Sequence, residues 1–505
     1  MDLSKKLNKK IDDNDDDNSI IERPVIKKKY SRRDFLSHSL MLSLGGLMLN
    51  KCSFLQNDKN NNKKIVIIGA GISGLTAASE LINAGFEVII LEARNRIGGR
   101  IQTINFNGFK MDAGASWIHG TKNNPLYLFS QKENIQTIVS YDEPSYLYDV
   151  DGKPINVKAW NEIKKNLNYL YDKSSYYPDK SLAELSDMVE SELNLNDRSK
   201  RLYYGAIRTE VEIPYAEDGK DLSSRVLLSN DSFSGNNVLF PNGMTQIIEN
   251  LSNNVDTRLN SFVTNINYDS DVVEIFFTDS SKIAPKRSCH ACHWDEDALP
   301  LANDKSIIAD MAIVTLPLGM LKNRIVKFFP ELPLRKTDAI NKISLGTMNK
   351  VFLYFDKSFW PEDAYFLEYF KEDSSNMMVF ESFSNIYNKN VLTAFLSGKQ
   401  ARMIEKLDER TTINLVTSEL KKMFGSSVPV PKKIYKTGWH TDPFALGAYP
   451  HIPPGSKLSY CDRIEESIDN KIFFAGDATS SAYLATAHGA YISGINAAKK
   501  IINLK

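Results

Sequence analysis

The stretch of this chain that most constrains its fold is residues 63–103, KKIVIIGAGISGLTAASELINAGFEVIILEARNRIGGRIQT. A short β-branched run ends at Gly69, and apolar residues at helical spacing follow Gly74. This order predicts a strand, a tight turn and a helix. In such a unit Gly69 allows the turn, Gly71 lets the backbone approach a pyrophosphate, and Gly74 permits close packing of the helix on the strand.

An acidic residue and a second glycine pair follow the predicted helix. The next predicted strand, residues 87–91, ends at Glu92, where a carboxylate is suited to hold a ribose hydroxyl. Gly99 and Arg100 then add another close backbone approach and a fixed cation beside the same diphosphate. A long, permanently held dinucleotide can use both, so the sequence favours FAD over a nicotinamide cofactor. The fold class is therefore predicted to be α/β, with a Rossmann-like FAD-binding domain.

Length and composition limit the rest of the interpretation. A chain of 505 residues with 42 % hydrophobic content is long enough to bury two sizeable cores, so we expect two domains. Its 62 basic and 62 acidic residues cancel, and we therefore expect no nucleic-acid partner. Four cysteines are too few for a disulfide framework.

Residues 1–62 are predicted to lie outside the fold, as a disordered terminus, an export signal and a linker. Residues 1–29 mix Lys, Asp and Asn with too little apolar content to pack. An arginine pair at 32–33 precedes an apolar run at 40–49, which is too short for a transmembrane helix and is typical of a twin-arginine signal. We expect the twin-arginine machinery to export the folded protein to the periplasm. A membrane tether through Cys52 or an uncleaved segment is the alternative.

Helical patterns dominate residues 123–235, which predicts a second domain inserted into the first. Acidic residues cluster there, and they form either a solvated acidic face, which is the favoured interpretation, or a funnel that attracts a polycation. These residues are Glu210, Glu212, Glu217 and Asp218. The predicted FAD-binding domain comprises residues 63–122, 236–320 and 436–505, and the predicted substrate-binding domain comprises residues 123–235 and 321–435.

A hairpin-like insertion at residues 282–305 contains the sequence CHACH at 289–293. Alone, this sequence matches a c-type haem attachment pattern. Haem attachment needs an unfolded acceptor, whereas a twin-arginine substrate arrives folded, and no predicted helical core surrounds the motif. We therefore favour a Cys289–Cys292 disulfide or free thiols over a bound metal, and predict no metal site.

Two further motifs supply candidate site residues. In residues 111–120, MDAGASWIHG, the small Gly114 and Ala115 permit close backbone approach to a flat ring system. His119 lies near them, although a single histidine after an apolar run is more often structural. Near the C-terminus, Gly476 and Asp477 end an apolar strand before a helix that opens with small residues, which again builds a cofactor-facing helix N-terminus.

Lys350 and two aromatic residues are the other candidates. Lys350 enters an alternating apolar strand, where it is either at an exposed edge or buried beside a ring as a positioned donor with a lowered pKa. Trp439 and Tyr449 bring two aromatic side chains towards one site.

Taken together and in this order, the motifs from residue 63 to the C-terminus resemble those of the flavin-containing amine oxidases, and among them most closely the polyamine and spermine oxidases. The resemblance implies a fold of the GR2 type, in which the FAD-binding domain is interleaved with a substrate domain built of a mixed sheet and helices. By position, it implies FAD contacts at Gly69, Gly71, Gly74, Glu92, Gly99, Arg100, Gly114, Ala115, Val263, Trp439, Gly476 and Asp477.

The resemblance also implies catalytic and substrate-binding roles. Lys350 matches the lysine that, in this family, reaches the flavin N5 through a water, and His119 matches a substrate-side histidine of animal polyamine oxidases. Tyr449 matches an aromatic residue that walls the amine against the flavin. Lys350, His119 and Tyr449 are thus candidate catalytic residues. His119, Tyr449 and Thr486 are candidates for substrate binding.

Three positions depart from related enzymes. Ala448 stands where monoamine oxidases carry a cysteine joined to the flavin, so the FAD is expected to be non-covalent. Thr486 replaces the second tyrosine of the monoamine oxidase cage, which weakens a monoamine assignment. Asp477 replaces the usual glutamate and is one methylene shorter, so a water can complete its contact.

The activity implied is oxidation of a primary or secondary amine to an imine and then an aldehyde, with O₂ reduced to H₂O₂. One alternative is an L-amino-acid oxidase or another flavin dehydrogenase, in which Arg208 or Arg225 would clamp a carboxylate. A flavin desaturase would need a largely apolar pocket. A flavin-bearing electron-transfer or interaction protein is the remaining alternative.

Overall fold

The structure is a computed structural model that describes residues 63–140, 144–228, 233–282, 305–384 and 388–504. The predicted N-terminal export signal, Cys52 and the CHACH sequence lie outside these residues. Within the described part of the chain, no helix is long and apolar enough to cross a membrane. The same residues contain no group of His, Cys, Asp and Glu side chains arranged to hold a metal ion.

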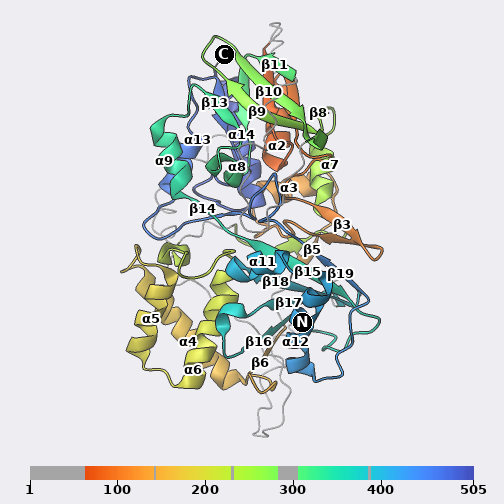
Figure 1. Ribbon diagram of the computed structural model, residues 1–505, viewed down its shortest axis with the longest axis vertical. Helices are drawn as coiled ribbons and strands as arrows, with labels where there is room; N and C mark the ends of the chain where they lie inside the picture. Colours follow the sequence, from red (N-terminus) through yellow and green to blue (C-terminus); the bar gives the residue numbers. More distant parts are fainter. Residues whose placement is uncertain (1–62, 141–143, 229–232, 283–304, 385–387, 505) are drawn as a thin grey trace, which may run out of the picture.

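Two halves lie one above the other along the longest axis of the molecule (Figure 1). The upper half is built on a parallel sheet in the order β21-β12-β1-β2-β8. Its strands are β1 (Lys64–Ile68), β2 (Glu87–Leu91), β8 (Asp256–Arg258), β12 (Met311–Val314) and β21 (Ile472–Phe474). A parallel sheet with glycine turns and crossover helices is the Rossmann-like unit that the sequence predicts.

Both faces of this parallel sheet are covered, and residues along β1 alternate between them. Ile65 and Ile67 pack against helices, whereas Val66 and Ile68 pack against a second sheet. The helices of the first face include α2 (Ile72–Asn83), α3 (Pro125–Lys132), α7 (Thr245–Leu251) and α14 (Ala487–Ile502). The second sheet has the order β11-β10-β9-β13, with β9 (Ser261–Asn267), β10 (Val273–Asp279), β11 (Lys305–Ala309) and β13 (Lys327–Phe329).

The lower half is built on a mixed sheet in the order β19-β15-β18-β17-β16-β6, in which only the β16–β6 pair is parallel. Its strands are β6 (Ser145–Tyr148), β15 (Met348–Tyr354), β16 (Phe366–Tyr369), β17 (Val379–Ser382), β18 (Val391–Ser397) and β19 (Lys433–Lys436). One face packs on α11 (Gly398–Glu405) and α12 (Glu409–Phe424). The combination of a mixed sheet and helices confirms the fold expected from the resemblance.

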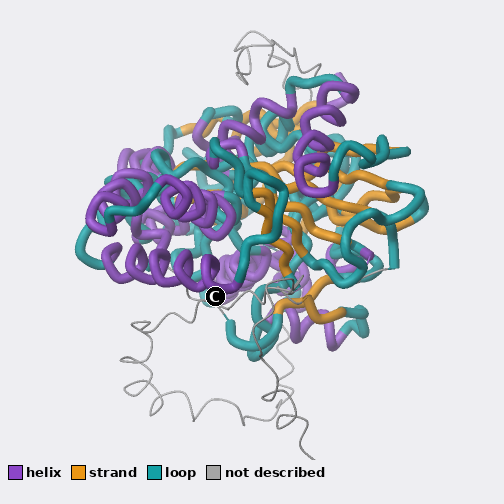
Figure 2. The backbone as a smooth tube through the Cα atoms, turned by 90° about the horizontal axis from the view of Figure 1, so that it is seen from below, coloured by secondary structure: helices purple, strands orange, loops and turns teal. Residues whose placement is uncertain are grey.

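A separate helical cluster flanks this sheet. It contains α4 (Val157–Ser174), α5 (Leu182–Leu193) and α6 (Asp197–Ile207), and a π-helical turn, η2 (Arg208–Glu212), follows α6. Seen from below, helices gather on the left and strands on the right (Figure 2). Short elements complete the fold: β3 (Thr103–Phe106), β4 (Phe109–Asp112), β5 (Ile138–Ser140), β7 (Asn237–Leu239), α8 (Leu318–Lys322), α9 (Leu334–Lys342), β14 (Ser344–Leu345), β20 (Pro450–His451) and α13 (Ser459–Glu465).

Packing does not follow two of the domain boundaries expected from the sequence. The sequence assigned residues 123–140 to the substrate domain, but Leu126 and Ile135 belong to the core of the upper half, and β5 pairs with β7. Residues 321–342 also lie with the upper half, where β13 pairs with β9 and α9 packs on α13. The expected boundaries were drawn where helical sequence patterns begin and end. They differ from the packing because the periodicity of a helix does not specify which core it covers.

Candidate active site

The glycine turn after β1 leaves open space at one position. Gly69 has a φ of +107°, and a Cβ on Gly74 would lie 2.1 Å from the Gly69 carbonyl oxygen, so both need glycine for internal reasons. A Cβ on Gly71 would meet no protein atom within 4 Å. Gly71 is also the N-cap of α2, which has no side-chain cap. The turn thus fits a pyrophosphate at the helix N-terminus.

Glu92 ties this turn to the end of β2. Its Oε2 accepts a hydrogen bond from the Ala70 amide at 2.7 Å, and its Oε1 accepts one from the Arg94 amide at 2.8 Å. Burial raises the pKa of Glu92. The Ser261 amide, at the start of β9, donates to the Glu92 carbonyl, and the buried Val263 follows on the same strand. Glu92, the predicted ribose contact, and Val263, another predicted FAD contact, therefore lie in adjacent segments.

Arg100 and Asp477 form a bidentate ion pair at 2.7 and 2.6 Å. Arg100 also donates to the Ala448 carbonyl oxygen at 2.9 Å, which joins three distant segments of the chain. Gly476, the residue before Asp477, has a φ of +144°, and a Cβ there would meet no protein atom within 4 Å. A second open backbone position therefore lies beside a charged pair, as a dinucleotide site requires. These residues and the turn at Gly71 fit FAD.

Gly114 is small for a different reason from the one the sequence suggested. A Cβ on Gly114 would lie 1.8 Å from the Arg100 carbonyl oxygen, so the protein backbone already requires glycine there. The Ala115 amide donates to the same oxygen at 3.2 Å. Gly99 lies at a φ of +58°, and its nearest neighbour is the Gly71 Cα. The two glycine motifs and residues 114–115 therefore form one packed unit.

Lys350 lies at the junction of the two halves and is buried. Its Nζ donates to the Asp112 and Gly114 carbonyl oxygens, both at 2.8 Å, and to the Ser116 Oγ at 2.5 Å. Burial lowers the pKa of Lys350 to about 8. Burial also raises the pKa of the nearby Asp112 carboxyl to about 6. Of the two placements that the sequence left open, the buried one is confirmed.

Aromatic and apolar side chains surround Lys350. Its Nζ lies 5.5 Å from the ring centroid of Trp117 and 5.6 Å from that of Phe395. Both rings pack in a cluster with Met348, and Met348 also packs against Trp439 and Tyr449. This cluster gathers the lysine and both predicted aromatic residues around one site. Cations are attracted to ring faces at such distances.

Trp439 and Tyr449 are each held by a hydrogen bond. The Trp439 Nε1 donates to the Ala113 carbonyl oxygen at 3.2 Å. The Tyr449 hydroxyl donates to the Pro214 carbonyl oxygen at 2.9 Å and lies 3.7 Å from the Met348 Sδ. Burial raises the pKa of Tyr449 well above its usual value, so the phenol stays neutral. These bonds fix both rings as walls.

His119 and Thr486 lie near the N-terminus of α14. His119 is exposed and lies near His488, whose pKa is lowered to about 4 by burial and further by His119. Edge-on contacts join His488 to Phe233 and Tyr483. Thr486 is the N-cap of α14, and its hydroxyl accepts from the Gly489 amide and donates to the Tyr483 carbonyl oxygen, both at 2.9 Å. That hydroxyl is therefore already used in the helix cap.

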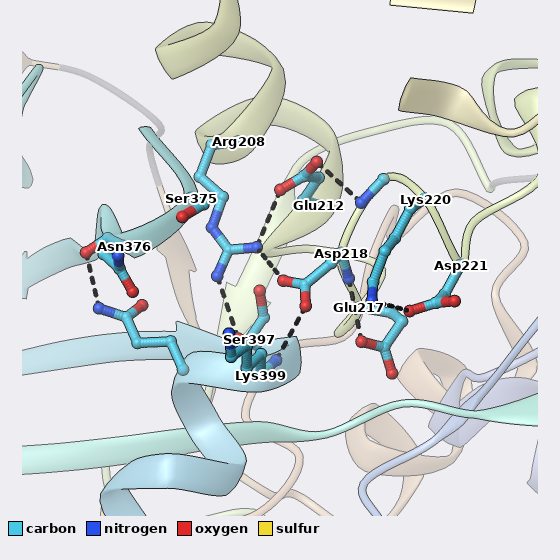
Figure 3. A network of polar contacts seen from close by, with 12 residues as sticks. Arg208, Glu212, Glu217, Asp218, Lys220, Asp221, Ser375, Asn376, Ser397 and Lys399 are labelled. Carbon is cyan, nitrogen blue, oxygen red and sulfur yellow. Dashed lines mark hydrogen bonds and ion pairs between the residues drawn. The ribbon is translucent and has the colours of Figure 1, made fainter. Parts of the chain in front are cut away.

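The acidic cluster is neither a solvated face nor a funnel, because three of its members are paired; Figure 3 shows the two that pair with Arg208. The buried Arg208 donates to Glu212 at 2.9 Å and to Asp218 at 3.0 Å, and also to the Ser397 carbonyl oxygen. Glu217 forms a bidentate pair with Arg402 at 2.8 and 2.9 Å. Arg208 lies beside these acids in the sequence, whereas Arg402 is 185 residues from Glu217, so sequence proximity could not reveal that second partner.

Neither arginine considered as a carboxylate clamp is available for that role. Arg208 is 1 % exposed, and both of its terminal guanidinium nitrogens donate within the network just described. Arg225 pairs with Asp179 at 2.7 Å, and that aspartate is 77 % exposed, so this pair lies at the surface. An amino-acid oxidase would therefore have to use a different cation.

Sequence reasoning missed several residues that contact the candidate site residues. Ser116 and Phe395 contact Lys350, and the Arg94–Asp442 pair, at 2.8 and 2.6 Å, anchors the segment that carries Trp439. Ser116 lies within a motif that was recognised, so it could have been proposed. Phe395 lies on an unremarkable apolar strand and gives no signal in the sequence.

Comparison with known proteins places the chain in context. A family model described as flavin containing amine oxidoreductase matches residues 72–502. The chain is 30 % identical over 464 residues to a probable polyamine oxidase 4 of Arabidopsis thaliana, covering 88 % of both proteins. It is also 30 % identical to a lysine-specific histone demethylase 1 homolog 3 of Oryza sativa subsp. japonica, of which the alignment covers 55 %.

A solved structure of a redesigned double mutant of putrescine oxidase has a similar fold. Its TM-score is 0.68 at 18 % identity, and the superposition covers 88 % of this chain and 99 % of that one. At this identity the likeness concerns the fold.

Proposed function

Because the chain belongs to the flavin-containing amine oxidases, which carry FAD, we propose that it oxidises a carbon beside a nitrogen of a polyamine. The two hydrogens removed from the C–N bond leave an imine, and O₂ takes both electrons and becomes H₂O₂. Water then cleaves the imine into an aldehyde and a shorter amine. FAD, when bound, supplies the electron transfer that protein side chains lack.

The single observation that carries this proposal is the environment of Lys350. A buried amine with a lowered pKa faces the junction of the two halves, between the rings of Trp117 and Phe395. Such a lysine can hold a water and exchange a proton there. Trp439 and Tyr449 would orient the substrate nitrogen, and aromatic walls suit both the methylene chain and a residual cation.

Other roles are proposed from position. Gly69, Gly71, Glu92, Arg100 and Asp477 would hold the nucleotide and diphosphate through backbone amides and charge. The absence of a thiol at residue 448 supports non-covalent binding. His119 and Thr486 would contact the substrate from the side of α14.

The test mixes the purified, FAD-loaded protein without air with spermine, spermidine, putrescine, tyramine or an L-amino acid. Bleaching of the flavin absorbance by a polyamine, followed by H₂O₂ release when air is admitted, is the expected result. If only an L-amino acid bleaches the flavin, the result would instead support the alternative of an L-amino-acid oxidase. If no amine bleaches the flavin, the proposed function is wrong.

An N-methylated lysine within a peptide is a second candidate substrate, because one relative is named a lysine-specific histone demethylase homolog. Oxidation of the methyl carbon would release formaldehyde, which a polyamine does not give. Measuring formaldehyde from a methyl-lysine peptide in the same assay separates the two substrates.

We also propose export of the folded protein to the periplasm, from the arginine pair at 32–33 and the apolar run that follows. Replacing both arginines by lysine should leave the protein in the cytoplasmic fraction of a bacterial host. Unchanged localisation would contradict the proposal.

A further inference from the structure

The segment between β19 and β20, residues 437–449, carries both Trp439 and Tyr449. It contains no helix or strand of its own. Its shape must therefore come from hydrogen bonds to the elements around it, and a small number of side chains supply most of them.

Asn349 is the first of these side chains, and it is fully buried. Its Oδ1 accepts from the Thr437 Oγ1 at 2.9 Å and from the Trp439 amide at 3.2 Å. Its Nδ2 donates to the Ala401 carbonyl oxygen at 3.1 Å and to the Glu405 Oε1 at 2.6 Å. All four hydrogen-bonding positions of the amide are thus occupied. No isosteric replacement can reproduce this pattern.

Glu405, at the end of α11, continues the same set of bonds. Its Oε1 accepts from the His440 amide at 2.9 Å, and its Oε2 accepts from the Thr441 amide at 2.8 Å. Three consecutive amides, those of residues 439–441, are therefore held by Asn349 and Glu405. A carboxylate that accepts backbone N–H bonds makes stronger bonds than a neutral acceptor.

The same segment is bonded to Lys350. The Lys350 amide donates to the Thr437 Oγ1 at 2.9 Å, and the Thr437 amide donates to the Lys350 carbonyl oxygen at 3.0 Å. Asn349 and Lys350 are neighbours on β15, so their side chains point to opposite faces of the sheet. Lys350 faces the candidate site, and Asn349 faces α11.

The far end of the segment is anchored to the nucleotide-binding turn. Asp442 pairs with Arg94, whose amide in turn donates to Glu92. Arg100 holds the Ala448 carbonyl oxygen. The segment is thus tied at one end to the sheet of the lower half and at the other to the upper half.

We infer that Asn349 and Glu405 are positioning residues that lock the aromatic segment 437–449 onto the strand that carries Lys350. Neither side chain is placed to touch the substrate. Both act through the backbone at Trp439, which they hold beside the strand of Lys350. The Trp439 carbonyl oxygen in turn accepts from the Gly447 amide at 2.8 Å, two residues before Tyr449. The effect on catalysis rests on the proposed function, whereas the locking of the segment does not.

The test compares Asn349→Leu with Gln400→Leu in the FAD-loaded protein. Gln400 is a buried amide on α11, the helix that carries Glu405, and it donates to the Asn376 carbonyl oxygen instead of to the aromatic segment. Amide hydrogen exchange of the peptide spanning residues 437–444 should become about tenfold faster or more in Asn349→Leu. The same peptide should exchange at the wild-type rate in Gln400→Leu.

A milder variant keeps the test decisive if Asn349→Leu folds poorly. Glu405→Gln retains one oxygen acceptor but loses the other, so it should accelerate exchange of the amides of residues 439–441 by a smaller factor. In both variants KM for the amine should rise more than kcat falls, with FAD retained. Wild-type exchange in both variants would overturn the inference. If exchange is faster in the variants but the protein oxidises no amine, the proposed function is wrong, whereas the positioning role of Asn349 and Glu405 is still supported.

Discussion

Two buried lysines in different regions of the molecule differ in one partner. Lys336, on α9 in the upper half, donates to the carbonyl oxygens of Arg463, Ile464 and Glu466 at 3.1, 2.7 and 2.6 Å. Lys350, at the junction, donates to two carbonyl oxygens and to the hydroxyl of Ser116. Burial lowers the pKa of both.

Burial lowers the pKa of Lys336 to about 7 and that of Lys350 to about 8, so the difference between them lies in whether loss of the proton leaves a buried oxygen without a donor. Three carbonyl oxygens only accept, so an ammonium with three N–H groups satisfies all of them and a neutral amine does not. A hydroxyl either accepts from Lys350 or donates to its lone pair. Lys350 can therefore lose a proton without leaving a buried group unpaired, whereas a neutral Lys336 would leave one of its three carbonyl oxygens without a donor. Burial and three contacts alone do not identify a catalytic lysine.

The largest expected effect is on Lys350→Met. Removing the buried amine should lower kcat for amine oxidation about 10²–10⁴-fold, the usual range for a group that transfers protons. FAD should stay bound, because no nucleotide-site residue changes. Steady-state H₂O₂ release and the flavin absorbance of the purified variant measure the two quantities. Lys336→Met is the matched control and should keep a near wild-type kcat; a similar loss in both variants would remove the distinction.

The second effect is on stability and belongs to Lys336. In Lys336→Met the three carbonyl oxygens at the end of α13 lose their donor in a buried position, which should lower the free energy of unfolding by about 1–3 kcal/mol. Urea unfolding followed by circular dichroism measures it. Arg335→Met on the same helix is the control, since its side chain is 65 % exposed, and it should change stability by less than about 0.5 kcal/mol. Equal losses would mean that the carbonyl contacts of Lys336 contribute little.

The third effect concerns the Ser116 hydroxyl and its influence on the pH dependence of the reaction. The lowered pKa of Lys350, about 8, predicts a rate that rises between pH 7 and pH 9 as the amine becomes able to accept a proton. In Ser116→Ala the ammonium loses a charged hydrogen bond and the neutral amine loses a weaker one, so this rise should move to lower pH by about one unit. The pH profile of single-turnover flavin reduction measures the shift. An unmoved rise in Ser116→Ala, or the same rise in Lys350→Met, would contradict the comparison.

Local sequence predicted the parts of this site that backbone geometry dictates. The turn from Gly69 to Gly74 and the acid at Glu92 were identified because a strand, a glycine turn and a helix in that order have few other uses. The mixed sheet of the lower half has no such local signature, and it followed from resemblance alone. Motif-based reasoning therefore succeeds where a ligand constrains the backbone of one short segment.

The partners of Lys350 could not be derived in this way. Ser116 lies 234 residues from Lys350 in the sequence, and Phe395 is paired with it only through the register of β15 and β18. Arg208 shows a different limit, because its two carboxylate partners lie only 4 and 10 residues away in the sequence. Alone in the sequence it is a possible clamp for a carboxylate, whereas the fold surrounds it with two carboxylates of its own. The pairing of side chains in the folded structure, and not residue type alone, determines these roles.

The smallest expected effect concerns Lys322, which has partners like those of Lys336 but is more exposed. Lys322 also donates to three carbonyl oxygens, those of Ile340, Asn341 and Ile343, at 3.3, 3.0 and 2.7 Å, but it is only partly buried. In Lys322→Met water can replace the lost donor, so the free energy of unfolding should fall by only about 0.5–1 kcal/mol. Urea unfolding beside the exposed control Lys342→Met, on the helix α9 whose last carbonyl oxygens Lys322 contacts, resolves a difference of this size. A loss as large as that of Lys336→Met would show that three carbonyl partners, and not their burial, set the stabilisation.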